Sequence, residues 1–150
     1  MTSLSLVAVP VLLDTATSSP QLLRQWSRMY HYGHLIMPSL AGGTLLLHAC
    51  TALQQRALGK PWVVFACAGG LTIAIAPFTW TVMETTNAEL FSRLERVGGS
   101  SSKGSAAASS DDDLKEIKGL VKRWSWLHLT RSMLPLAGTV LAVFGTFAEM

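Results

Sequence analysis

The stretch SRMYHYGHLIMPSLAGGTLLLHA (residues 27–49) decides the fold, because it passes from polar and aromatic residues into a long apolar run. That run belongs to Leu35–Leu53, which is close to the roughly 20 residues that cross a bilayer core as a helix. Trp62–Met83 and Leu127–Phe147 have similar length and character, and membrane helices tolerate the glycines and prolines inside them. Leu4–Leu13 is apolar but too short to cross alone, and we interpret it as the distal part of a first helix. The pattern predicts an all-α integral membrane four-helix bundle.

The composition also favours a membrane protein. Of the 150 residues, 49% are hydrophobic and only 14% are charged, whereas soluble domains carry about 25% charged residues. This length corresponds to a single domain, residues 1–150. The net charge of +3 is not gathered in a basic stripe with interleaved aromatic residues, which argues against nucleic-acid binding. Cys50 and Cys67 lie in apolar runs, where a cysteine is more often a small hydrophobic residue than half of a disulfide.

Two connections between the apolar segments are polar. Before the second span, QLLRQWSRMY (residues 21–30) spaces its leucines, Trp26 and Met29 at helical intervals, which predicts an interfacial amphipathic helix. Before the fourth span, GGSSSKGSAAASS (residues 98–110) predicts a flexible low-complexity linker. The sequence DDDLKEIKGLVKRW (residues 111–124) then predicts a helix, because acidic residues suit its N-terminus and basic residues follow.

Lysine and arginine residues predict the orientation of the chain. In a four-span topology the first and third connections share one side of the membrane and hold nine of these residues, whereas the second connection holds two. Because cytosolic loops are enriched in Lys and Arg, the nine-residue side is predicted to be cytosolic, with both termini across the membrane. The nine are Arg24, Arg28, Arg93, Arg96, Lys103, Lys115, Lys118, Lys122 and Arg123, and the two are Arg56 and Lys60.

Polar side chains from three distant segments gather at the predicted cytosolic end of the spans. They are His31 and His34; Thr85, Thr86 and Asn87; and Trp124, His128 and Arg131. The two histidines of the first group are three residues apart, and the last group stands at i, i+4 and i+7, so each shares one helical face. Arg131 lies about one turn inside the apolar segment, where a charge is by default a functional site facing the bundle interior.

The residues alone leave two interpretations of this end open. The histidines form either a polar collar where the helices leave the bilayer or a functional site, as bases or ligands at a buried pocket. Nearby aromatic residues fit an aromatic belt at the membrane interface, and this is the favoured role for Trp26. These aromatic residues are Trp26, Tyr30, Tyr32 and Trp124. His48, at the far end of the second span, is predicted to be structural, and the sequence contains no glycine-rich phosphate loop, zinc-type cysteine pair or nucleophile elbow.

Four short motifs occur in a defined order along the chain. They are SLSLVAVPVLL (residues 3–13), QWSRMYHYGHLIMPSLA (25–41), Thr-Asn (86–87) and WSWLHLTRSMLPLAG (124–138). This arrangement, together with the apolar spans, resembles the fungal anthrone oxygenase-like membrane proteins, a family formerly catalogued as a domain of unknown function. The resemblance implies an enzyme that oxidises an anthrone to an anthraquinone with dioxygen, in the biosynthesis of polyketide secondary metabolites.

The chemistry implied by the resemblance assigns roles to the polar residues. An anthrone has an acidic methylene group, and its deprotonation gives an electron-rich anion that passes an electron to dioxygen without a cofactor. Such a site needs a base, for which histidine is suited, and a cation for the developing oxyanion, for which Arg131 is suited. The candidate catalytic residues are His31, His34, His128, Arg131 and Asn87, and the candidate substrate-binding residues are Tyr32, Trp124 and Thr86.

A version of the site with a metal ion or haem stays open beside the cofactor-free one. His31, His34 and His128 are the residues that would hold copper, iron or haem, because imidazole is a common ligand of these metals. No other metal ligand is assigned.

The remaining expectations concern partners and location. The expected partners are the lipid bilayer, a hydrophobic aromatic small molecule as substrate, and enzymes of a polyketide pathway. The expected location is the endoplasmic reticulum or a related vesicle membrane, with several spans. The alternative function is a non-catalytic membrane scaffold or a hydrophobic-ligand-binding protein, which the same architecture fits.

Overall fold

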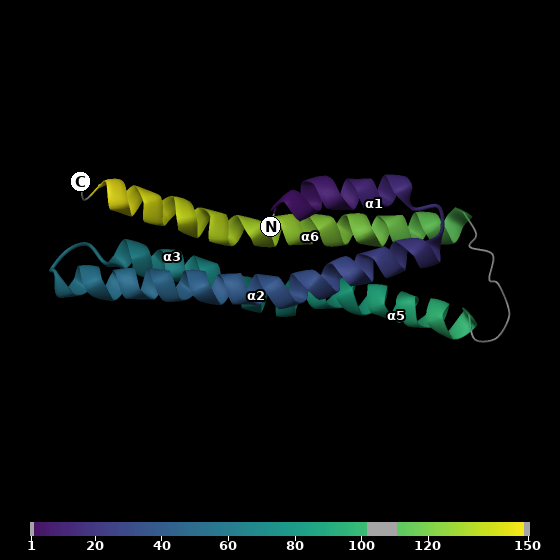
Figure 1. Cartoon of the computed structure of the whole chain (residues 1–150), viewed down its shortest axis with the longest axis horizontal. Helices are drawn as coiled ribbons and strands as arrows, with labels where there is room; N and C mark the ends of the chain where they lie inside the picture. The colour runs from purple at the N-terminus through teal and green to yellow at the C-terminus, as the bar shows by residue number, and fades with distance from the viewer. Residues whose placement is uncertain (1, 102–110, 149–150) are drawn as a thin grey trace. The chain divides into compact units, whose positions relative to one another are not determined.

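The computed structural model describes residues 2–101 and 111–148, and the regular structure within these ranges is entirely helical. The elements in chain order are the π-helical η1 (Leu4–Ala8), α1 (Val9–Thr15), α2 (Ser19–Ala57), α3 (Val63–Ile73), α4 (Ile75–Phe78), the π-helical η2 (Thr79–Met83), α5 (Glu84–Ser101) and α6 (Asp111–Phe147) (Figure 1). Because η1 continues into α1, and α3 to α5 follow one another closely, the elements form four helical segments. The predicted all-α, four-helix fold is confirmed.

Three of the four segments are long and apolar enough to cross a membrane. They are Ser19–Ala57, Val63–Gly99 and Asp111–Phe147, and each contains one of the three predicted spans. The first segment, Leu4–Thr15, is apolar but shorter. These lengths and compositions are consistent with a membrane protein of several spans. The predicted position of both termini across the membrane needs a fourth crossing, for which Leu4–Thr15 is too short by itself.

The chain divides into two compact units, and each of the three long helical segments contributes to both. The first unit comprises Met1–Gly33 and Thr81–Leu129, and the second comprises His34–Trp80 and Thr130–Met150.

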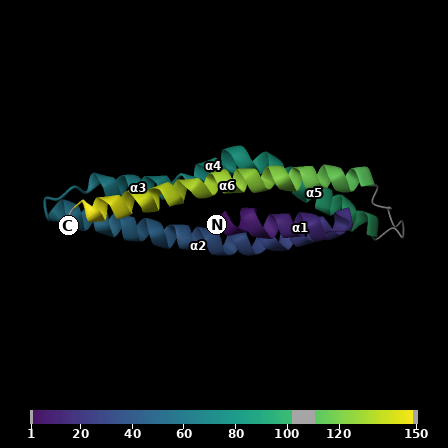
Figure 2. The same cartoon turned by 90° about the horizontal axis from the view of Figure 1, so that it is seen from above.

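In the first unit, η1–α1, the start of α2, α5 and the start of α6 run roughly parallel around a shared interior (Figures 1 and 2). The largest buried apolar side chains of this interior are Val9, Leu22, Leu23, Trp26, Met83, Leu90, Ile117, Val121 and Trp124. The helical spacing predicted for residues 21–30 is confirmed, since Leu22, Leu23 and Trp26 are 0% exposed while Arg24 and Arg28 are exposed. The apolar face of this helix packs on protein, and the helix continues without a break into the second span, while its interfacial position stays a prediction.

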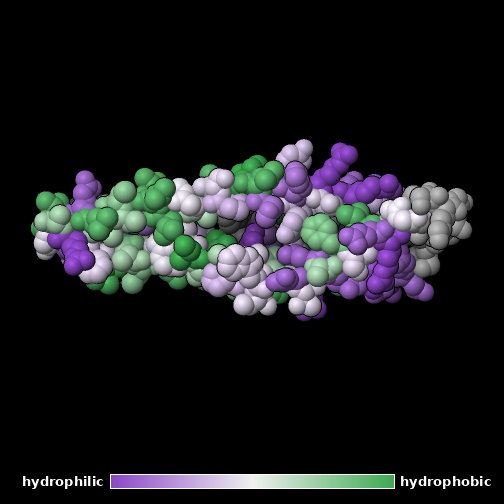
Figure 3. Space-filling model, turned by 90° about the horizontal axis from the view of Figure 1, so that it is seen from below, coloured by the Kyte–Doolittle hydropathy of each residue, from purple (hydrophilic) through white to green (hydrophobic). Residues whose placement is uncertain are grey.

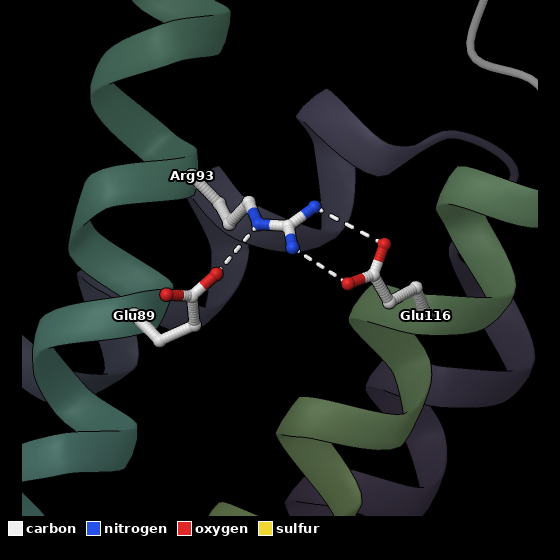
Figure 4. A network of polar contacts seen from close by, with 3 residues as sticks. All are labelled: Glu89, Arg93 and Glu116. Atoms are coloured by element: carbon white, nitrogen blue, oxygen red, sulfur yellow. Dashed lines mark hydrogen bonds and ion pairs between the residues drawn. The ribbon is translucent and has the colours of Figure 1, made fainter.

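An arginine of α5 joins α5 to α6 at the polar end of the first unit (Figure 4). Arg93 Nε donates to Glu89 Oε1 at 2.8 Å, and its two terminal nitrogens donate to the carboxylate oxygens of Glu116 at 2.6 and 3.1 Å. This paired geometry uses the planar fork of arginine and fixes the register between the two helices. Of the predicted linker, residues 98–101 are the last residues of α5, and residues 102–110 lie outside the described residues.

The second unit exposes apolar side chains over most of its surface. In Figure 3 the part of the surface formed by the C-terminal half of α2 and by α3 is mainly hydrophobic, whereas hydrophilic side chains cover most of the visible first unit. Large apolar residues of the second unit that are at least half exposed are Leu35, Ile36, Leu40, Leu46, Leu47, Leu53, Leu58, Val63, Ile73, Trp80, Leu136, Phe144 and Phe147. A soluble protein rarely exposes an apolar surface of this extent, and lipid contact explains it.

Close packing of α3 on α6 in the second unit depends on glycine. A Cβ atom built at Gly138 would lie 2.7 Å from the carbonyl oxygen of Ala68, and one at Gly145 would lie 2.8 Å from Val64 Cγ1. Small residues permit such approaches between membrane helices, where packing rather than water exclusion drives association. Gly42, on the lipid-facing part of α2, has no atom within 4 Å of the corresponding position.

We expect Gly138→Ala to destabilise the second unit by about 1–3 kcal/mol, because the added methyl group must push against the backbone of α3. The measurement is thermal unfolding of the protein purified in detergent. Gly42→Ala is the matched control and should be neutral or slightly stabilising, since alanine favours a helix over glycine. Equal melting temperatures for the two variants would contradict the packing of α3 against Gly138.

Candidate functional site

The first unit contains a cluster of aromatic rings contributed by α2, α5 and α6. Trp26 lies at its centre, with ring centroids 5.1 Å from Phe91, 5.5 Å from Tyr30 and 6.0 Å from Trp124. The Trp124 contact is edge-on, at 89°, which is a favourable aromatic geometry. Three distant segments therefore meet within this unit, and of the polar residues predicted to gather, Trp124 and His128 belong to this cluster. We call Trp26, Tyr30, Phe91, Trp124 and His128 the aromatic cluster.

His128 joins this cluster to the first helical segment. Its imidazole is 4% exposed and lies 5.1 Å from the Trp124 ring, and its Nδ1 is 3.2 Å from the hydroxyl oxygen of Ser5. Ser125 Oγ donates to the carbonyl oxygen of Ser5 at 3.2 Å, which adds a second link between η1 and α6. The imidazole is thus held in one orientation inside the unit, on one side by a ring and on the other by a hydroxyl group.

Several buried polar atoms in the first unit have no hydrogen-bond partner among the described residues. They are Trp26 Nε1, Trp124 Nε1, Thr86 Oγ1 and Asn87 Oδ1. Leaving a buried polar group unsatisfied costs about 1–3 kcal/mol, so such groups in native proteins bond another protein group, a water molecule or a ligand. The two indole N–H groups can donate to carbonyl and hydroxyl oxygens of a ligand, and the amide carbonyl can accept from its hydroxyl groups. This set of donors and acceptors suits an aromatic ligand that carries hydroxyl and carbonyl groups.

The other predicted residues near the second span lie on the surface. His31, Tyr32 and His34 are all exposed, and the His31 ring packs edge-on against the Tyr32 ring with centroids 5.8 Å apart. The described residues contain no group of three or more His, Cys, Asp or Glu side chains placed to hold a metal ion, so His31, His34 and His128 do not form such a group. The roles predicted for these exposed residues stay predictions.

Arg131 belongs to the second unit, where its side chain is half-buried. Its Nη1 donates to Thr79 Oγ1 at 3.1 Å, and the Thr79 hydroxyl donates to the carbonyl oxygen of Ile75 at 2.7 Å. Thr79 is the first residue of the π-helical turn η2, a local widening that often occurs at functional sites. The guanidinium group is therefore oriented by a side chain that is itself fixed to the backbone.

One local expectation from the sequence is wrong, and the place of the Thr-Asn pair is now defined. Thr86 is 2% exposed inside α5, which continues to Ser101. Trp26 is not part of an interfacial belt, because it is completely buried by protein. Trp80 and Trp126, which are 72% and 70% exposed, are the tryptophans placed to contact lipid or its interface.

The sequence interpretation missed Ser5 and Phe91. Ser5 stands in an apolar stretch, and the available signal is that it shares a helical face with Val9, which is 1% exposed. Phe91 follows Asn87 by one helical turn, so the spacing points to a common face of α5.

His48 and the two cysteines lie in the second unit. His48 is half-buried on α2, where it faces Gly69 of α3, and its Nε2 is buried without a partner among the described residues. Cys50 and Cys67 are free and exposed. The predicted structural role of His48 stays a prediction.

Comparison with known proteins gives one family and no solved structure. A family model described as anthrone oxygenase matches residues 26–141. The anthrone oxygenase AgnL2 of Paecilomyces divaricatus is 48% identical over 148 residues, which cover 97% of this chain and 85% of the relative. The anthrone oxygenase gedH of Aspergillus terreus is 43% identical over 142 residues, which cover 95% of this chain and 86% of the relative. The monooxygenase hypC of Dothistroma septosporum is 36% identical over 146 residues, which cover 97% of this chain and 74% of the relative. No solved structure matches the chain.

Proposed function

The chain belongs to the anthrone oxygenase family, and from this premise we propose that it oxidises an anthrone to the corresponding anthraquinone with dioxygen. The observation that carries the proposal is the buried His128 imidazole, held by Ser5 and packed on Trp124 inside a unit rich in aromatic rings. The relatives described above are named as oxygenases, which favours an enzyme over a non-catalytic scaffold or ligand carrier.

The net reaction balances without an external reductant. The methylene carbon of the anthrone loses two hydrogen atoms and gains one oxygen atom, and the second oxygen atom of dioxygen leaves as water. A base first removes one methylene proton, and the resulting anion passes one electron to dioxygen. The carbon radical and superoxide then combine, and protonation gives a hydroperoxide. Removal of the second proton from the same carbon breaks the O–O bond, which forms the new carbonyl group and releases water after protonation of the leaving hydroxide.

We assign the proton transfers to His128. An imidazole works as a general base near neutral pH, and burial beside Trp124 keeps it in a water-poor site next to a planar surface. Ser5 holds the ring in place through Nδ1, and in the tautomer in which Nδ1–H donates to the Ser5 hydroxyl oxygen, the basic lone pair is on Nε2. Ser5 is therefore a positioning residue for the base.

The substrate rings and oxygen atoms have matching groups in the same unit. The rings would stack against Trp124, as the resemblance implied, and Tyr32 is the second residue proposed for stacking. The carbonyl and phenolic groups would bond the unpartnered atoms of Thr86 and Asn87. Outside this unit, Arg131 keeps the role predicted from the sequence, the stabilisation of the developing oxyanion, as a separate proposal.

The experiment that tests the function is dioxygen uptake by the purified protein with a model anthrone, using ¹⁸O₂. One ¹⁸O atom should appear in the new quinone carbonyl and the other in water, at a rate above the spontaneous oxidation seen with heat-inactivated protein. Equal rates with active and inactivated protein would show that the protein does not catalyse this reaction.

We propose that the reaction needs no metal or haem, with copper, iron or haem bound by histidine as the alternative. Elemental analysis and absorption spectra of the active preparation distinguish the two. A stoichiometric metal or haem whose loss abolishes activity would establish the alternative.

We also propose that the protein is a multi-pass protein of the endoplasmic reticulum or a related vesicle membrane, close to polyketide-pathway enzymes. The nine basic residues of the first and third connections favour a cytosolic position for that side. The C-terminus would then lie across the membrane, and the same placement of the N-terminus remains a prediction.

The orientation can be tested at Ser105, which lies in the predicted linker outside the described residues. A protease site inserted there should be cut in intact microsomes, because the positive-inside rule places it in the cytosol. A second site inserted after Gly59, in the connection that holds Arg56 and Lys60, should be cut only after detergent is added. The reverse pattern would overturn the orientation.

A further inference from the structure

A polar groove on the first unit lies apart from the residues assigned to catalysis. It has a volume of about 500 Å³ and is lined by Gln21, Arg24, Gln25, Ser27 and Arg28 of α2 and by Leu94 of α5. Its lining contains two guanidinium groups and no carboxylate. The groove is therefore electropositive, and we infer that it binds the headgroup of an anionic phospholipid.

The side chains are arranged to present donors. Arg24 Nε is held by the carbonyl oxygen of Pro20 at 3.2 Å, so the terminal nitrogens of the guanidinium are the groups it can offer to a ligand. Gln21 Oε1 accepts from the backbone N–H and the hydroxyl of Thr17 at 3.2 and 2.9 Å, so Gln21 can offer its amide N–H groups. Fixed guanidinium and amide donors suit a phosphate group, which accepts several hydrogen bonds at once.

Gln25 also lines the groove, but its Oε1 is buried and has no hydrogen-bond partner among the described residues. The groups that can reach a ligand are therefore the donors of the two arginines and of Gln21. They suit the phosphate of an anionic phospholipid, such as phosphatidylinositol or phosphatidylglycerol.

The position of the groove along α2 favours a lipid as the source of this phosphate. Arg28 precedes Leu35, the first residue of the predicted second span, by only seven positions in the sequence. Arginines just outside a span commonly contact headgroups, and the predicted cytosolic side is the one on which anionic lipids are enriched.

The test is native mass spectrometry of the full-length protein in detergent with defined lipids added. The wild type should retain phosphatidylinositol and phosphatidylglycerol at least tenfold better than phosphatidylcholine. Arg24→Gln with Arg28→Gln should reduce this preference by about ten- to thirtyfold, from about 1 kcal/mol for each arginine near a headgroup. The matched control is Arg56→Gln with Lys60→Gln, which removes the same charge from the other connection and should leave the preference intact.

One further arm identifies the source of the phosphate. Competition by millimolar inorganic phosphate would assign the site to soluble phosphate and overturn the lipid as its ligand. Loss of the preference in the Arg56 and Lys60 control, or no preference in the wild type, would overturn the groove as an anion site. A gel-filtration profile like that of the wild type confirms that each variant is folded.

Discussion

His128→Gln should lower kcat for anthrone oxidation by about 10²–10⁴-fold, the range for losing a positioned general base. Glutamine has a size similar to histidine and keeps a polar group at this buried position, but it cannot accept a proton near neutral pH. Because Trp124 still provides the ring surface beside this position, KM should change much less than kcat. The measurement is initial dioxygen uptake at several substrate concentrations, with spontaneous oxidation subtracted.

Variants of the two exposed histidines locate the base. His31→Gln and His34→Gln should each lose less than about tenfold in kcat, because an exposed imidazole lacks the fixed orientation of a general base. A loss at either position as large as that of His128→Gln would place the base on α2 instead. Full activity of His128→Gln would show that His128 is not the general base.

Ser5 provides a finer test of the same arrangement. Ser5→Ala removes a hydrogen-bond partner of His128 Nδ1, so the ring loses its fixed orientation, kcat should fall and the pH dependence of kcat should shift. Ser5→Thr keeps the hydroxyl group and should restore most of the wild-type profile. A purely structural role would give equal losses in both variants and an unchanged pH profile.

The helices were predictable because their signals are local. Run length identified the three long apolar segments, and the spacing of Leu22, Leu23 and Trp26 identified one face of α2. The spacing does not say what covers that face, because lipid interface and protein interior both favour apolar and aromatic side chains. Trp26 was therefore assigned to an interface although α5 and α6 bury it.

The pairing within the candidate site could be predicted only in part. Three segments were expected to meet, and Trp26, Phe91 and Trp124 do meet in the first unit. The hydrogen bond between Ser5 and His128 joins residues 123 positions apart, and a single serine in an apolar helix gives no local sign of such a partner. Similarly, the three-residue spacing of two histidines shows that they share a face but not that this face is exposed.

Arg131→Lys should lower kcat by about 10²–10³-fold although the positive charge is kept, which is the range for losing one oxyanion donor. Arginine can bond Thr79 through Nη1 and direct its other N–H groups elsewhere, whereas the single ammonium group of lysine cannot reproduce this planar fork. Arg123→Lys, an exposed position on the same helix, is the matched control and should retain full activity.

Thr79→Val separates the charge of Arg131 from its orientation. Valine is close to threonine in shape but removes the hydroxyl oxygen that accepts from Nη1, so the guanidinium group keeps its charge and loses its anchor. If orientation matters, kcat should fall by about tenfold, less than in Arg131→Lys, because part of the arginine population still adopts the productive geometry. If Arg131 only contacts lipid headgroups, both variants should oxidise the anthrone at the wild-type rate. The oxyanion role would then pass to another donor, and Asn87 in the first unit would be the next residue to replace.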